Sequence, residues 1–175
     1  MKPWIPSAAR AASLLACALA VAPPSARAQE SGVDADRAAV LAVVQEFFDA
    51  MTAADSARTG AVMLRDGVNY GIRVEPEYFL ASMPTADYMA SLASRESRIV
   101  ERIWDPTVLL HGPLAVVWAP YDIHGGGEFL HCGVDAFTLL RTDAGWKIAG
   151  VVFTMETTGC DPSPLGPLED AGTPP

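Results

Sequence analysis

From Arg98 to Thr157 the apolar residues leave helical spacing and alternate with a period of about two. Alternation of this kind indicates strands with one buried face, and glycine, proline and aspartate supply the turns between them. The dipeptide Asp105-Pro106 predicts a bend or bulge in the first strand, because proline cannot donate a hydrogen bond to the ladder. The expected strands cover residues 98–110, 114–124, 128–141 and 146–157.

Helices are expected before this sheet. One amphipathic helix, which Asp34 or Asp36 can cap and which ends near Ala54, carries its apolar residues at three- and four-residue spacing: Val40, Val44, Phe47 and Met51. Asp55 predicts the cap of a shorter second helix.

A weakly alternating strand is expected at residues 68–74, and Thr85, beside Pro84, is expected to cap a third helix over residues 86–93. Helices followed by long antiparallel strands predict an α+β fold, with the helices on one face of a curved sheet.

The first 28 residues are typical of a cleavable secretory signal. Two basic residues open the segment, an apolar run covers residues 11–22, and small residues precede the expected cleavage before Gln29. Twelve apolar residues are too few to span a bilayer, which needs about 20 helical residues. Cys17 offers a competing interpretation as a lipoprotein site, which the apolar residues after it disfavour. We therefore expect a periplasmic or secreted protein with no stable membrane span.

Charge and composition limit the classes of partner that the chain is expected to bind. The whole chain carries a net charge of −9, and removal of residues 1–28 takes away three basic and no acidic residues, which leaves −12. The basic stripe that neutralises a phosphate backbone is missing, so we expect no nucleic acid partner. Five prolines in residues 161–175 predict a disordered tail, which leaves one domain at residues 29–160.

Several stretches together resemble the nuclear transport factor 2-like superfamily, which includes SnoaL-like polyketide cyclases, ketosteroid isomerase and scytalone dehydratase. They are the capped amphipathic helix, the short helix after Asp55 and the closing hairpin from Val134 to Ile148. Residues 117–121, 131–137 and 158–160 are similar to a secreted bacterial branch called lumazine-binding-like.

The resemblance covers residues 34–160 and implies a cone-shaped half-barrel, roofed by helices, whose mouth holds a small ligand. It also implies a homodimer formed through the outer sheet face. The catalytic pattern of ketosteroid isomerase does not map onto this chain, so isomerase chemistry is not carried over. Because this scaffold hosts enzymes, binding proteins and assembly modules, function must be argued from the site.

The last hairpin assigns the faces of the sheet. If Arg141 pairs with Trp146, then Leu139 meets Ile148, and the register continues with Phe137 opposite Gly150, Asp135 opposite Val152 and Gly133 opposite Thr154. Trp146 and Ile148 are expected to enter the core, so the same face carries His131, Asp135, Phe137 and Leu139. A two-residue turn at Gly125-Gly126 would place Trp118 opposite Gly133, and a slip of one residue there would reverse the face of Trp118.

His131 and Asp135 are the candidate catalytic residues. The imidazole titrates near neutrality, and a buried aspartate can become a base when desolvation raises its pKa. Four residues on one strand separate them by about 13 Å, so each needs a partner from another element. The available polar partners are Tyr70, Arg73, Tyr78, Tyr88 and Tyr121. The alternative is a structural role, with His131 as a hydrogen-bonded wall residue and Asp135 satisfied by the backbone or by Arg73.

The candidate ligand-binding residues are Trp118, Tyr121, Phe137, Arg73 and Tyr88. Aromatic rings can stack on a flat ligand, although aromatic residues at strand spacing are more often part of a core. The three histidines do not converge at metal-ligand spacing, so we expect no metal and no cofactor.

Cys132 and Cys160 remain after signal cleavage and are expected to form a disulfide in an oxidising compartment. The hairpin register pairs Cys132 with Met155, so residues 157–159 must turn back to bring the two cysteines together, and Gly159 permits this turn.

The outer face of the sheet is also apolar, with Val134, Ala136, Thr138, Leu140, Ala149, Val151 and Phe153. Helices can cover only one face, so we expect a homodimer through the outer face.

The first functional hypothesis is a secreted protein that binds a small apolar or aromatic molecule. The alternative is a cofactor-free SnoaL-like lyase or isomerase that uses His131 or Asp135 as the proton carrier. A third hypothesis is a non-catalytic assembly module that binds another secreted protein through its outer sheet.

Overall fold

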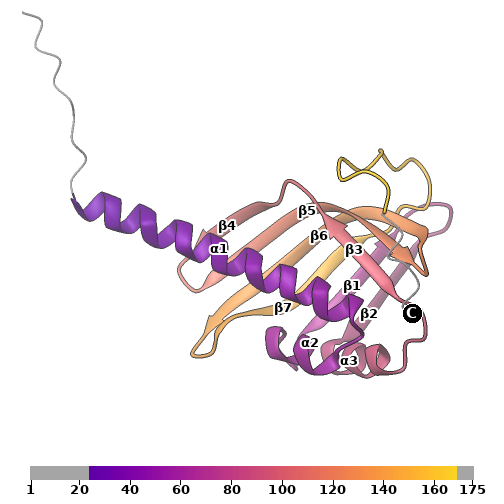
Figure 1. The fold of residues 1–175 in the computed structure, drawn as a ribbon, viewed down its shortest axis with the longest axis horizontal. Helices are drawn as coiled ribbons and strands as arrows, with labels where there is room; N and C mark the ends of the chain where they lie inside the picture. Colours follow the sequence, from indigo (N-terminus) through magenta and orange to yellow (C-terminus); the bar gives the residue numbers. More distant parts are fainter. Residues whose placement is uncertain (1–23, 169–175) are drawn as a thin grey trace, which may run out of the picture.

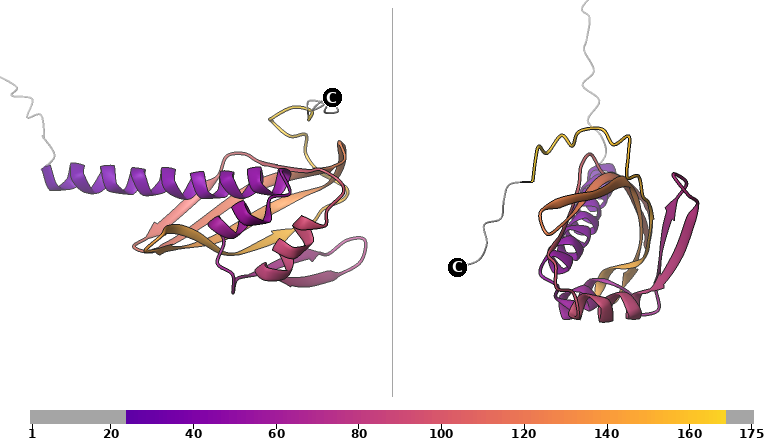
Figure 2. Two further views of the ribbon diagram at one scale, coloured as in Figure 1. Left: turned by 60° about the horizontal axis from the view of Figure 1, so that its bottom comes forward. Right: turned by 90° about the vertical axis from the view of Figure 1, so that its right-hand side faces the viewer.

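A computed structural model of the chain describes residues 24–168, so most of the expected signal segment lies outside the described residues. The fold is α+β: the N-terminal helices pack on the concave side of a curved, unclosed sheet (Figures 1 and 2). The elements are α1 (Pro24–Thr52), α2 (Ser56–Val62), β1 (Val68–Arg73), β2 (Phe79–Pro84), α3 (Thr85–Ala93), β3 (Ile99–Ile103), β4 (Thr107–His111), β5 (Leu114–Gly125), β6 (Glu128–Thr142) and β7 (Gly145–Thr154).

Helix α1 begins at Pro24, ten residues before the expected cap at Asp34, so the predicted start was wrong. No proline follows Pro24 in this segment, and proline itself is tolerated in the first turn of a helix, where its missing N–H has no partner to lose. Among residues 32–52 of the helix, whose burial the structure describes, the first buried residue is Val40, and all of them lie after the expected cleavage before Gln29.

Three helix caps were predicted, and one was right. The Asp55 carboxylate accepts hydrogen bonds from the N–H groups of Ala57 and Arg58, each at 3.0 Å, which confirms it as the cap of α2. Thr85 is instead the first residue of α3, after an extended Pro84, and its hydroxyl is buried without a partner in the protein. The prediction that Thr85 caps α3 was therefore wrong.

The seven strands follow the order β2-β1-β7-β6-β5-β3, with β4 also paired to β5. All pairs are antiparallel except β1 with β7, which run parallel. Strand β2 was not predicted, because its residues do not alternate and it ends in proline; proline is tolerated here because β2 lies at the edge of the sheet. The expected single strand 98–110 is two strands, β3 and β4, separated where Asp105 takes a positive φ of 45°.

The closing hairpin has the predicted register at its tip, with Arg141 opposite Trp146 and Leu139 opposite Ile148. Beyond Leu139 the register shifts by one, because Ala149 is an extra residue on β7, and Phe137 lies opposite Val151. The alternation of β6 is unaffected, so its predicted inner face is correct. Residues Val151 and Phe153, predicted to face outward, instead point into the concave interior.

The hairpin between β5 and β6 differs from the prediction. Its turn residues are Gly126 and Gly127, both with positive φ, and a further irregularity follows Ile123. Together they place Trp118 opposite Ala136 rather than Gly133, a displacement of three positions. An odd displacement reverses the face, so Trp118 lies on the outer side of the sheet with 53% of its surface exposed.

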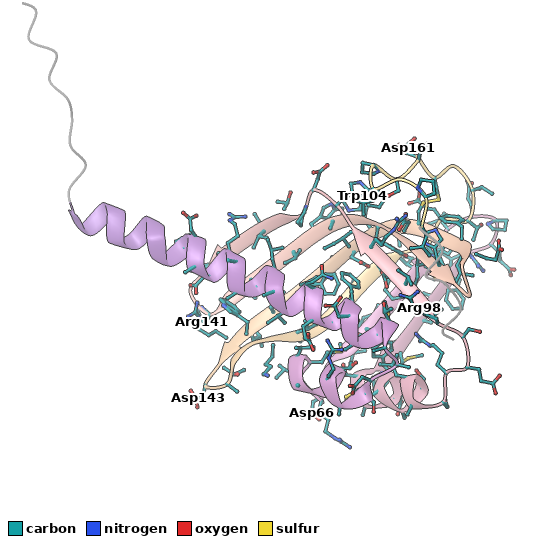
Figure 3. The ribbon with its side chains drawn as sticks, in the orientation of Figure 1. Asp66, Arg98, Trp104, Arg141, Asp143 and Asp161 are labelled. Carbon is teal, nitrogen blue, oxygen red and sulfur yellow. A yellow bond between two sulfur atoms is a disulfide. The ribbon has the colours of Figure 1, made fainter. Side chains whose placement is uncertain are left out.

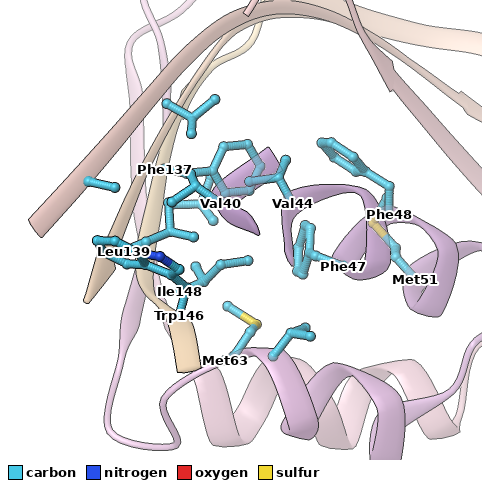
Figure 4. Close-up of a cluster of buried hydrophobic side chains, with 14 of the residues drawn as sticks. Val40, Val44, Phe47, Phe48, Met51, Met63, Phe137, Leu139, Trp146 and Ile148 are labelled. Carbon is cyan, nitrogen blue, oxygen red and sulfur yellow. The ribbon is translucent and has the colours of Figure 1, made fainter. Parts of the chain in front are cut away.

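The core forms where α1 lies in the concave sheet (Figure 4). The Phe137 ring of β6 meets Phe47 at 5.8 Å and Phe48 at 5.7 Å between centroids, in edge-to-face contacts. Val40 and Val44 of α1, together with Met63 after α2, belong to the same buried cluster as Leu139, Trp146 and Ile148 of the closing hairpin. This packing fixes which side chains of β6 face the interior.

Cys132 and Cys160 form the expected disulfide, with their Cα atoms 6.0 Å apart. Cys132 bridges Glu156 rather than the expected Met155, as the register shift in β7 requires. Gly159 has a φ of 76°, and the chain turns back there as predicted. Residues 157–168, here called the C-terminal strap, run over the outer side of β5 and β6, where Asp161 lies (Figure 3). Residues 169–175 of the expected tail lie outside the described part.

Candidate functional site

A cavity of about 380 Å³ lies between the concave sheet, α1 and α3. Its walls are mainly apolar, and its ionisable side chains come from α3, from the loop after α3, and from β3, β5 and β6. The apolar part includes Phe47, Met51, Phe79, Met83, Ile99, Ile123, Phe137, Val151, Phe153 and Met155. The ionisable part consists of Tyr88, Arg95, Glu101, Tyr121, His131 and Asp135. An apolar cavity with a few converging polar groups is the usual form of a small-molecule site.

Two carboxyl groups meet inside this cavity. Glu101 of β3 and Asp135 of β6 belong to strands separated by β5, and the curvature of the sheet brings them within hydrogen-bonding reach. Asp135 is 1% exposed. Two carboxylates at this distance cannot both hold a negative charge in an apolar setting, so the pair keeps a proton.

Burial raises the pKa of the Asp135 carboxyl to about 7, while the hydrogen bond from Glu101 acts in the opposite direction. Burial, followed by the negative charge of Asp135, raises the pKa of Glu101 well above its usual range. Near neutral pH, Glu101 therefore donates a proton to a hydrogen bond with Asp135, and the pair titrates as a unit.

A second polar pair fixes the tautomer of His131. The Tyr121 hydroxyl lies 2.6 Å from the carbonyl oxygen of Thr154, which can only accept, so the hydroxyl donates to it. The same hydroxyl oxygen lies 2.9 Å from Nδ1 of His131 and must accept from it. The proton is thus on Nδ1, which leaves a lone pair on Nε2.

Burial lowers the pKa of His131, so the ring is neutral at pH 7. Burial and the nearby carboxylates raise the pKa of Tyr121, which keeps its hydroxyl protonated. His131 can accordingly accept a proton or a hydrogen bond through Nε2, whereas Tyr121 holds the imidazole in place.

Most of the predicted site residues line the cavity: His131, Asp135, Tyr121, Phe137 and Tyr88. Tyr121 is the partner that His131 was expected to need. Trp118 does not line the cavity, because the shifted register between β5 and β6 places it on the outer face of the sheet. Arg73 lies beyond it, where its guanidinium stacks on Phe79 at 5.5 Å and Nε donates to the carbonyl of Glu77.

The partner of Asp135 was missed. Glu101 lies between Ile99 and Ile103 in an alternating strand, and all three share one face. An acid flanked two residues away on each side by isoleucine is expected on the apolar face, so the signal was present. Arg95 was missed as well, because it follows a helix in an irregular segment that shows no periodicity.

Comparison with known proteins places the chain in a family. A family described as "Putative lumazine-binding" matches residues 35–154. The chain belongs to this family. No curated protein sequence is detectably similar to it.

Solved structures with low sequence identity share the fold. A "putative dehydratase" of the NTF2-like family from Streptomyces avermitilis is 22% identical, with a TM-score of 0.56, over 70% of this chain and 97% of that one. An NTF2-like protein with a cystatin-like fold from Novosphingobium aromaticivorans is 14% identical, with a TM-score of 0.61, over 79% and 93% of the two chains. The protein Kfla4162 from Kribbella flavida is 18% identical, with a TM-score of 0.61, over 71% and 93%.

Within residues 24–168, none of the helices combines the length and the apolar character needed to cross a bilayer.

The raised pKa of Asp135 predicts how stability depends on pH. The folded state holds the proton up to about pH 7, whereas the unfolded chain releases it near 3.8, so stability falls as pH rises between these values. Relative to Asp135→Asn, the wild-type protein should lose on the order of 2–4 kcal/mol of unfolding free energy between pH 4.5 and 8. Urea unfolding at intervals of one pH unit measures this difference.

The control is Asp143→Asn, which changes an exposed carboxyl in the turn of the last hairpin (Figure 3). Its stability should run parallel to that of the wild-type protein. If the Asp135→Asn curve is also parallel to wild type, the carboxyl pair does not hold its proton as described.

Proposed function

We propose that this protein binds a small, mainly apolar or aromatic molecule inside the cone. The observation that carries the proposal is the cavity of about 380 Å³, with mainly apolar walls and a few polar groups. The rings of Tyr88, Tyr121 and Phe137 supply flat surfaces for a ring system. The family description, which refers to lumazine binding, agrees with a ligand of this shape.

We also propose that the protein acts outside the cytoplasm, after cleavage before Gln29. The disulfide between Cys132 and Cys160 supports this, because such bonds persist in oxidising compartments. Intact mass measurement of protein recovered from the periplasm or medium should give a chain that begins at Gln29; a chain retained in the cytoplasm at full length would contradict it.

Filling the cavity should abolish binding. Ala81 of β2 lines the cavity, so Ala81→Trp should remove the thermal stabilisation that any ligand from a panel of lumazine, flavins, steroids and naphthalene derivatives gives the wild-type protein. Leu80→Trp, on the opposite face of the same strand, should retain it. Absence of binding across the panel, or equal binding by Ala81→Trp, would refute the proposal.

A second function, proton transfer on the bound molecule, is favoured by the carboxyl pair. The Asp135 carboxylate would take a proton from a carbon next to a ligand carbonyl, and the electron pair would move into the enolate. Where a carbon–carbon double bond is conjugated with that enolate, return of the proton to the carbon at the far end of the conjugated system completes an isomerisation without a cofactor. His131 is the alternative base, through its free Nε2.

Hydrogen–deuterium exchange tests this second function. 2-Tetralone, a bicyclic ketone with acidic C–H groups, is incubated with the protein in deuterated buffer and followed by NMR. Asp135→Asn should slow the protein-dependent exchange by a factor of about 10²–10⁴, with Asp143→Asn unchanged. A loss in His131→Gln alone would assign the base to His131, and exchange at the buffer rate with wild-type protein would exclude both.

The outer face of the sheet supports the proposal of a homodimer. Trp118, Val152 and Tyr70 are 53%, 49% and 42% exposed and lie in one row across β5, β7 and β1, with Ala136 of β6 between the first two. An exposed apolar row of this kind across a sheet is typical of a protein interface.

Trp118→Glu should convert the dimer to a monomer in light scattering after size exclusion. Leu165→Glu, an equally drastic change at an exposed position of the C-terminal strap, should leave the dimer intact. A wild-type protein that is monomeric at micromolar concentration would contradict the proposal.

A further inference from the structure

We propose that the molecule held in the cone is a monocarboxylic acid, whose carboxylate lies between Arg95 and Tyr88. This inference rests on the proposed binding function and specifies the chemical class of its ligand. The inference is drawn from two buried polar groups that line the cavity and have no hydrogen-bond partner in the protein.

Among residues 24–168, Arg95 is the only lysine or arginine that lines the cavity. Its Nη1 is buried without a hydrogen-bond partner in the protein. None of the ion pairs among residues 24–168 includes Arg95, although four are formed elsewhere in that part of the chain. A guanidinium that faces an apolar cavity without a paired carboxylate is suited to receive one from a ligand.

Tyr88 supplies a second donor beside Arg95. Its hydroxyl is buried and has no partner in the protein, while its ring packs on Phe47 at 5.9 Å between centroids. Burial raises the pKa of Tyr88, so the hydroxyl remains a donor. Tyr88 lies on α3 and Arg95 in the irregular segment that follows it, and both line the same cavity, where the positive charge of Arg95 acts on the Tyr88 hydroxyl. Together they offer N–H and O–H groups to the two oxygens of one carboxylate.

The carboxyl pair does not oppose an anion at this position. Glu101 and Asp135 share a proton and carry at most one negative charge between them near neutral pH. Oδ2 of Asp135 is a third buried atom without a partner in the protein, and it can meet a polar group elsewhere on the same ligand. The ligand therefore has an acidic end toward α3 and a neutral polar group toward β6.

One negative charge is favoured over two. The cavity holds one cation beside a carboxyl pair that carries at most one negative charge, so a dianion such as a phosphate monoester would leave more negative charge unpaired there than a monocarboxylate. The acidic chain also repels polyanions at long range. The ligand class is thus a carboxylate rather than a phosphate.

Three ligands that share a naphthalene ring distinguish a carboxylate from a neutral alcohol and from a phosphate: 2-naphthoate, 2-naphthalenemethanol and 2-naphthyl phosphate. Calorimetry with wild-type protein should give at least about tenfold tighter binding for the carboxylate than for the other two. Arg95→Gln should weaken 2-naphthoate about tenfold and change the alcohol by less than about twofold. Tyr88→Phe should weaken the carboxylate by a smaller factor.

Two variants control for general effects on the fold. Arg98→Gln removes an exposed cation three residues away, just before β3 (Figure 3), and should leave all three affinities unchanged. Arg95→Lys keeps the charge and should retain part of the preference for the carboxylate.

Equal affinity of the carboxylate and the alcohol for wild-type protein would overturn the inference and leave the proposed binding function standing. Tighter binding of the phosphate, or equal weakening of carboxylate and alcohol by Arg95→Gln, would overturn it as well. If none of the three ligands binds, the proposed function fails together with the inference.

Discussion

The packing of α1 in the concave face of the sheet is the contact on which the rest of the structure depends. Phe137 is completely buried between Phe47 and Phe48, and this fixes the inward face of β6. Because side chains alternate along a strand, an inward Phe137 requires an inward Asp135 two residues before it. The apolar contact between helix and sheet therefore forces a carboxyl group into the interior.

A carboxyl group in this position costs stability unless it finds a partner or remains protonated. Asp135 does both, since it meets Glu101 from across the curved sheet and shares its proton. Evolution of a stable core alone would favour apolar residues at both positions, because a buried polar pair of this kind seldom adds to stability. The pair makes sense as part of a site, together with the oriented imidazole of His131 and the unpartnered groups of α3. The apolar side chains that line the rest of the cavity suit an apolar ligand.

The features predicted correctly from the sequence are those set by neighbouring residues. The turn after Thr142 fixes the tip of the last hairpin, and the Asp55 cap depends on residues three positions away at most. The same local logic placed His131, Asp135 and Phe137 on one face, and it would have found Glu101 between its two isoleucines.

The features that were missed depend on contacts distant in sequence. The extra residue Ala149 occurs where β7 meets β1, whose Val68 carbonyl lies so close that a Cβ on Gly150 would come within 2.4 Å of it. The face of Trp118 depends on two irregularities in one hairpin, and the strand β2 is defined only by its pairing with β1. Arg95 reaches the cavity because it follows α3, which lines the cavity. No periodicity in the sequence predicts this position.

Whether Glu101 and Asp135 share a proton can be measured by carbon-13 NMR of the side-chain carboxyls. The two resonances are assigned by their loss in Glu101→Gln and Asp135→Asn, and their shifts are followed from pH 3 to pH 9. The structure predicts that Asp135 titrates near pH 7 and that Glu101 keeps its proton well above the range usual for glutamate. Two carboxyls that both ionise near their ordinary values of 3.8 and 4.5 would contradict the account.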